Sequence, residues 1–145
     1  MSSPPLRSIL LIDDDVISNL FNKIFIGKLD LDVEVDVALN GAEALKFLQE
    51  KVADRDDLLL IPRLILVDIR MPVMDGWKFL EAYDSLFDEE IKKQLVVVML
   101  TTSEDEGDMI KAINNPLIKE VIKKPLSESK FNKVIKKFFI KKETP

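Results

Sequence analysis

The chain has 145 residues, 47% of them hydrophobic and 32% charged, with a net charge of −5 and neither cysteine nor histidine. This length suits one domain with a sizeable core, and the balance of residues is that of a folded protein. Absent cysteine excludes disulfides and thiolate metal sites, and absent histidine excludes an imidazole base, an imidazole metal ligand and an internal phosphohistidine.

The charge pattern and hydropathy also limit the partners. A net negative charge gives no electrostatic footprint for nucleic acid, and we interpret the locally basic stretch 136–142 as a solvated helix end. No apolar run approaches the roughly 20 residues that span a bilayer. We therefore expect a cytoplasmic protein with no nucleic-acid partner and no membrane insertion, and the lack of cysteine fits a reducing compartment.

The first third of the chain predicts two strand and helix units. Residues 8–12 are apolar and end at three consecutive aspartates, 13–15, after which 16–25 carry apolar residues at helical spacing. Valines alternate with acidic residues over 33–37, which predicts a strand with one less-buried face, and a helical pattern follows over 44–48.

The centre of the chain is a short apolar run, 64–67, that ends on Asp68. Such a run is typical of a strand buried on both faces, and a buried strand ends before it meets an unpaired charge. Met71-Pro72 and Asp75-Gly76 then predict a loop, and a third helical pattern runs over 77–83.

The last part predicts two more units. Residues 96–100 form a second uninterrupted apolar run, and 109–113 form a helix that Asn115-Pro116 ends. A short strand over 120–122 precedes a final helix, which Ser127 can cap. The pattern gives about five strands and five helices.

Strands that alternate with helices at this spacing indicate right-handed βαβ units around a parallel sheet. We predict a flavodoxin-like three-layer α/β/α fold with a five-stranded sheet of order 2-1-3-4-5. The expected organisation is one domain over 1–145 with short tails at 1–6 and 142–145 and no output domain.

Polar residues stand where the central strands end: Asp13 and Asp14, then Asp68, Thr101 and Lys124. A single aspartate after a strand is usually a cap or a turn former. Together, however, three carboxylates repel one another unless a cation joins them, and an all-oxygen pocket suits Mg²⁺. A lysine and a hydroxyl would hold phosphoryl oxygens, which makes Asp68 the candidate nucleophile.

These residues resemble the signature of the receiver domain of two-component response regulators, of the single-domain chemotaxis type. The resemblance covers nearly the whole chain and rests on Asp13-Asp14, Asp68, Met71-Pro72, Asp75-Gly76, Thr101 and Lys124-Pro125. It implies a phosphorylated signalling domain rather than an enzyme with an external substrate. Asp68 would accept a phosphoryl group from a sensor histidine kinase or a histidine phosphotransfer protein, and would lose it slowly by autodephosphorylation.

The resemblance also implies a metal site. Mg²⁺ would be held by Asp14, Asp68 and the backbone carbonyl of Arg70, with Asp13 acting largely through water. Thr101 would move toward the phosphoryl group, and Lys124 would contact it.

The chain departs from the family pattern at several positions. Val121 stands where the family often has an aromatic switch residue, and 115–118 replace a common Gly-Ala pair. Arg70 and Ser103 occupy positions that tune the phosphoryl lifetime in the family. The downstream protein is unknown, and its contact face would include Ile110, Lys111, Val121 and Lys123.

Three neighbours of the site have simpler interpretations. We interpret Asp15 as the cap of the first helix rather than a metal ligand. Lys123 should point away from the site by strand alternation, and Trp77 should pack at a helix start.

Two other interpretations remain open. A receiver-like interaction module would act without phosphorylation. A phosphatase of the haloacid dehalogenase type is suggested by residues 13–17, but Ile17 stands where that motif has threonine or valine, and the Asp68 stretch would be unexplained.

Overall fold

The computed structural model describes residues 6–29, 31–53, 63–102 and 105–139. Five strands form one parallel sheet of order β2-β1-β3-β4-β5, as the sequence predicts. The strands are β1 (Ser8–Ile12), β2 (Glu34–Ala38), β3 (Leu64–Val67), β4 (Val96–Thr101) and β5 (Ile118–Lys123).

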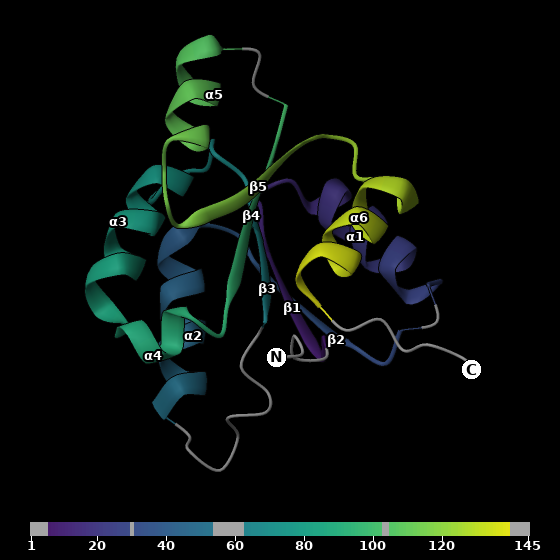
Figure 1. Ribbon diagram of the computed structural model, residues 1–145, viewed down its shortest axis with the longest axis horizontal. Coiled ribbons are helices and arrows are strands. Elements are labelled where there is room, and N and C mark those ends of the chain that lie inside the picture. The colour runs from purple at the N-terminus through teal and green to yellow at the C-terminus, as the bar shows by residue number, and fades with distance from the viewer. Residues whose placement is uncertain (1–5, 30, 54–62, 103–104, 140–145) are drawn as a thin grey trace.

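Helices cover both faces of the sheet. They are α1 (Val16–Gly27), α2 (Gly41–Ala53), α3 (Gly76–Leu86), α4 (Glu89–Lys92), α5 (Glu106–Ile113) and α6 (Glu128–Phe138). Figure 1 shows α1 and α6 on one side of the sheet and α2, α3 and α4 on the other, while α5 lies at the upper end. The predicted flavodoxin-like three-layer architecture is confirmed.

The central strands divide the core into two clusters. In β1, Leu10 and Ile12 belong to the cluster beneath α2 and α3, whereas Ile9 and Leu11 belong to the cluster beneath α1 and α6. All four are fully buried or nearly so, because a strand alternates its side chains between the two faces and both faces are covered. At about 1.5–3 kcal/mol for each buried side chain, this short strand anchors both helical layers.

Several local expectations need correction. The valine alternation in β2 does not mark a buried face throughout, because β2 is an edge strand and Val37 is 36% exposed. The short helix α4 was not predicted, since four residues are too few to show a helical period. Leu6, expected in a tail, packs against the core beneath α1 and α6, whereas 1–5 and 142–145 lie outside the described residues.

Two end signals are confirmed. Ser127 caps α6, because its side chain accepts a hydrogen bond from the Lys130 N–H at 3.2 Å. Of the basic stretch 136–142, Lys136 and Lys137 are exposed in the last turn of that helix, where cations suit the dipole, and 140–142 lie outside the described residues. Over the described ranges, no helix has the length and apolar character that crossing a membrane requires.

Candidate functional site: an acidic pocket at the strand ends

The strand register places the acidic residues side by side. Ile12 at the end of β1 pairs with Val67 at the end of β3, so that Asp13 and Asp68 follow at neighbouring positions. The Asp68 N–H donates to the Ile12 carbonyl at 2.9 Å, and the Asp13 N–H donates to the Ala38 carbonyl at 3.0 Å. These ladder bonds extend the sheet by one residue on each strand and fix both backbones.

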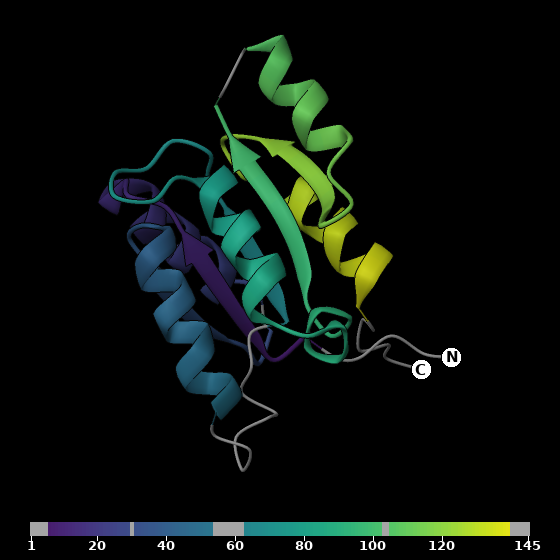
Figure 2. The ribbon, with the colours of Figure 1, turned by 90° about the vertical axis from the view of Figure 1, so that its left-hand side faces the viewer.

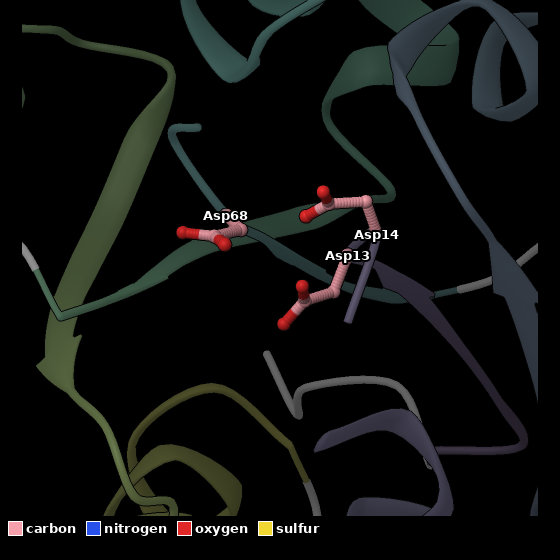
Figure 3. A group of neighbouring side chains, drawn as sticks. All are labelled: Asp13, Asp14 and Asp68. Carbon is pink, nitrogen blue, oxygen red and sulfur yellow. The ribbon is translucent and has the colours of Figure 1, made fainter. Parts of the chain in front are cut away.

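Three carboxylates meet at this edge of the sheet. Figure 3 shows Asp13 and Asp14 on the chain leaving β1 and Asp68 on the chain leaving β3, with their side chains gathered around one space. One oxygen from each lies within 4.8 Å of the others. Asp13 is buried, Asp68 is partly buried and Asp14 is exposed. Oxygen ligands at such spacing, open to water on one side, fit a hard divalent cation such as Mg²⁺.

Lys124 lies against two of the three carboxylates. Its Nζ forms an ion pair with Asp13 Oδ2 and a longer contact of 3.4 Å with Asp68 Oδ2. The lysine side chain is 12% exposed, and those of Asp13 and Asp68 are 7% and 13% exposed. The cation thus joins residues 111 positions apart in the sequence and offsets the repulsion between the two acids.

The surroundings change the pKa values of Asp68 and Lys124. Burial raises the pKa of Asp68, and the charge of Asp13 adds to this, while Lys124 opposes it. Burial by itself lowers the pKa of Lys124, but the hydrogen bond to Asp13 and the charges of both acids outweigh it, so that the net pKa is raised. Lys124 is therefore a cation at neutral pH, whereas the charged form of Asp68 is less favoured than that of a free aspartate and gains from any additional positive charge.

The loop after Asp68 is held tightly under the strand end. The Ile69 N–H donates to Asp68 Oδ1 at 2.8 Å, and the Gly76 N–H donates to the Ile69 carbonyl at 2.9 Å. A Cβ at Gly76 would lie 2.4 Å from the Asp68 carbonyl oxygen, so glycine is required by close backbone approach. In the loop between Asp68 and Gly76, Val73 has a φ of 65°, in the left-handed region.

Thr101 and Arg70 occupy different parts of the site. Thr101 is buried at the end of β4, and its carbonyl accepts a hydrogen bond of 2.9 Å from the Lys124 N–H, which ties the two strand ends together. The Arg70 guanidinium does not join the acidic cluster but reaches Asp108 in α5 at 2.6 Å. The predicted phosphoryl contact of the Thr101 hydroxyl and metal contact of the Arg70 carbonyl stay predictions.

The simpler interpretations of the neighbouring residues hold. Asp15 caps α1, because Oδ1 accepts from the Ile17 and Ser18 N–H groups at 3.0 and 3.2 Å. Lys123 is exposed, while Lys124 faces the site. Trp77 is partly buried and packs against the core.

The other family departures have mixed outcomes. Val121 is partly buried against the same core cluster. Residues 115–118 form a turn in which Asn115 Oδ1 accepts from the Leu117 N–H at 2.9 Å. Ser103 lies outside the described residues.

Sequence reasoning missed two contributors. Asn19 is 4% exposed, and its Nδ2 donates to the Asp13 carbonyl at 2.8 Å, which fixes the backbone that carries the acidic pair. The sequence offered a signal for this contact, because Asn19 is a polar residue among apolar ones in the first helix, six residues after Asp13. The ion pair between Arg70 and Asp108 joins residues 38 positions apart and has no local signal.

Comparison with known proteins gives the family. Residues 9–136 match the family model described as the response regulator receiver domain, which covers most of the chain. The protein belongs to this family of two-component signalling domains.

The individual relatives agree. The response regulator Rcp1 of Synechocystis is 32% identical over 114 residues, covering 75% of this chain and 70% of Rcp1. A hybrid signal transduction histidine kinase G of Dictyostelium discoideum is 32% identical over 113 residues, which make up 77% of this chain but only 3% of that protein. The crystal structure of a two-component response regulator from Cytophaga hutchinsonii superposes with a TM-score of 0.82 at 29% identity, covering 92% of this chain and 97% of the other.

Proposed function

We propose that this protein is a phosphoacceptor whose Asp68 carboxylate takes a phosphoryl group in the presence of Mg²⁺. The observation that carries the proposal is the convergence of Asp13, Asp14 and Asp68 with the ammonium of Lys124 at one sheet edge. A carboxylate cluster alone binds a cation, but an added lysine suits a site that must also hold phosphoryl oxygens.

The chemistry is a single displacement at phosphorus. An Asp68 oxygen forms a bond to phosphorus while the bond from phosphorus to the donor nitrogen breaks, giving an acyl phosphate and a free imidazole on the donor. Mg²⁺, held by Asp14, Asp68 and the Arg70 carbonyl with Asp13 acting through water, would neutralise charge on the phosphoryl group. Lys124 contacts another phosphoryl oxygen, and Thr101 moves to a third. Water later attacks the phosphorus and its bond to the Asp68 oxygen breaks, which restores the carboxylate and releases inorganic phosphate. This is the only hydrolysis we propose.

The phosphohistidine of the donor lies outside these 145 residues, since they contain no histidine. A sensor histidine kinase or a histidine phosphotransfer protein fits, and the hybrid histidine kinase among the relatives is consistent with such a pathway. We infer that the reaction takes place in the cytoplasm, in keeping with the absence of cysteine.

The surface beside the site suits docking of that donor. Along α1, which begins directly after the acidic loop, large apolar side chains are exposed on one stripe: Val16 66%, Ile17 64%, Leu20 55%, Phe21 65% and Ile24 47%. An apolar stripe of this size on a surface helix is typical of a protein interface. Because a donor must bring its phosphohistidine to Asp68, a partner seated on α1 would be correctly placed.

The phosphoacceptor proposal is tested by incubation with acetyl phosphate and Mg²⁺ followed by intact mass measurement. We expect the wild type to gain one phosphoryl group, Asp68→Asn to gain none, and the exposed control Asp32→Asn to behave as wild type. An unmodified wild type with intact fold would instead support an interaction module that acts without phosphorylation. A label mapped to Asp13 would support the dehalogenase-type alternative.

The docking proposal is tested with two donors. Phe21→Ala should keep the wild-type reaction with acetyl phosphate but slow transfer from a phosphorylated kinase or phosphotransfer protein, by about tenfold if the side chain is central to the interface. Ile113→Ala removes an equally exposed apolar side chain, 72% exposed, from α5 and is the matched control. Equal transfer to both variants would place the donor elsewhere.

A further inference from the structure

The helix α5 is attached to the segment that follows Asp68 by two polar contacts. Arg70, two residues after Asp68, forms an ion pair of 2.6 Å with Asp108 in the first turn of α5. Trp77, in the first turn of α3, lies beneath the Lys111 ammonium, which is 4.5 Å from the ring centroid. Since Asp108 and Lys111 are three residues apart, both contacts hold the same face of α5.

Apolar packing contributes little to the position of this helix. Of its eight residues, Asp108 and Ala112 are buried, whereas Ile110 and Ile113 are 59% and 72% exposed. By contrast, α3 buries Phe79, Leu80 and Tyr83. In the two views of Figures 1 and 2, α5 stands at the upper end of the molecule, above α3. A helix with so little buried apolar surface lies toward the low end of local stability, so its polar contacts weigh more in holding it.

The two partners of the ion pair are unequal. The Asp108 side chain is 12% exposed, whereas the Arg70 side chain is 67% exposed. The carboxylate is therefore fixed within the fold and depends on charge compensation, while the guanidinium can turn in solvent without losing packing. Because arginine binds phosphate in a bidentate manner, such an exposed guanidinium can exchange its carboxylate partner for a phosphoryl group within reach.

Phosphorylation of Asp68 supplies such an anion. A phosphoryl group adds about −1.5 to −2 charge and three acceptor oxygens, and arginine binds phosphate in a bidentate manner. We propose that the Arg70–Asp108 ion pair is a latch that holds α5 while Asp68 is unmodified, and that phosphorylation draws Arg70 away from Asp108 and releases the helix. This inference rests on the proposed phosphorylation of Asp68 and says how that event reaches the surface that carries Ile110 and Ile113.

Hydrogen exchange of the α5 amides, measured with and without acetyl phosphate and Mg²⁺, tests the latch. In the wild type we expect exchange in α5 to rise about fivefold or more on phosphorylation, which is the lower range of ordinary coupling between sites. Asp108→Asn should exchange fast already without phosphorylation and change little afterwards. Glu120→Gln breaks another ion pair, with Lys137 at 3.1 Å, and should respond as wild type does.

Swapping the two charges of the ion pair tests whether the contact is a latch or only a structural contact. In the double variant Arg70→Asp with Asp108→Arg, the pair is restored with opposite polarity, so α5 should be protected again. Phosphorylation should no longer release it, because an acid at position 70 is repelled by the phosphoryl group. Release in this variant equal to wild type would overturn the latch.

Intact mass on the same samples distinguishes the two proposals. If the wild type gains one phosphoryl group while α5 exchange stays unchanged, the latch is wrong and the phosphoacceptor assignment stands. If no phosphoryl group is gained, the phosphoacceptor proposal is wrong and the latch falls with it.

Discussion

Gly76 is a position where a single added carbon would press on the backbone of Asp68, the proposed phosphoacceptor. Its Cβ in Gly76→Ala would lie 2.4 Å from the Asp68 carbonyl oxygen and 3.1 Å from Ile69 Cα. Non-bonded heavy atoms favour about 3.5–4.0 Å, so the backbone at Asp68 would have to move by about 1 Å. Overpacking of this kind costs about 1–3 kcal/mol, against at most about 1 kcal/mol gained from the helix preference of alanine.

We therefore expect Gly76→Ala to lose up to about 2 kcal/mol of unfolding free energy, because the helix preference of alanine offsets about 1 kcal/mol of the overpacking cost. A displaced carboxylate should also slow phosphorylation by acetyl phosphate by about tenfold or more, since misplacement of about 1 Å has cost up to about 100-fold in enzymes. Urea unfolding and the rate of mass gain measure the two effects.

Gly27→Ala is the matched control, because a Cβ at the last residue of α1 meets nothing within 4 Å. Neither glycine has a positive φ, so backbone strain does not distinguish the two positions. At Gly27, alanine should be neutral or slightly stabilising. If Gly76→Ala proves as stable and as reactive as Gly27→Ala, close approach does not explain the glycine.

Three further outcomes are expected. Mg²⁺ at about ten times its dissociation constant should stabilise the wild type by about 1.4 kcal/mol in thermal unfolding. Asp14→Asn should reduce this gain, whereas Asp32→Asn should not. Equal gains in the two variants would refute the metal site. Hydrogen bonds from the Ser18 N–H and hydroxyl lower the pKa of Asp15 below its usual 3.8. Its stabilising effect is therefore complete above that value and is lost as pH falls through the lower folded-state pKa. The urea midpoint of Asp15→Ala should lie below that of the wild type at pH 7, and the difference should shrink as pH falls below about 3.8. Val73 has a φ of 65° and is 83% exposed. Because asparagine tolerates the left-handed region, Val73→Asn should stabilise the protein by about 1 kcal/mol, or roughly 2–4 °C in melting temperature. An unchanged or lower melting temperature would contradict this.

The layers of this fold were predictable because its signals are local. Uninterrupted apolar runs such as 64–67 can be satisfied only by a strand covered on both faces, and the spacing of runs and helical patterns then gives the parallel order. The juxtaposition of Asp13 with Asp68 follows from that order, since the carboxyl ends of parallel strands share one edge. The cap at Asp15 follows from the residue type at a helix start.

What the sequence did not reveal depends on distance and on side-chain direction. The edge position of β2 exposes Val37 in spite of its regular alternation, and alternation alone cannot tell an edge strand from a covered one. The contact between Arg70 and Asp108 depends on how α5 is placed at the end of the sheet. Such a contact is set by tertiary packing, which no local pattern encodes.

The contact between Lys124 and Asp13 spans 111 positions of the chain. Its partners directly follow β1 and β5, and β3 and β4 lie between these two strands in the sheet, so the two residues meet only after those strands have paired. A chain still emerging from the ribosome, or one with β5 detached, carries Asp68 but lacks the ammonium beside it. On the proposed function, competence to accept a phosphoryl group would thus be gained only once β5 has joined the sheet, and incompletely folded molecules would take little phosphate from their donor.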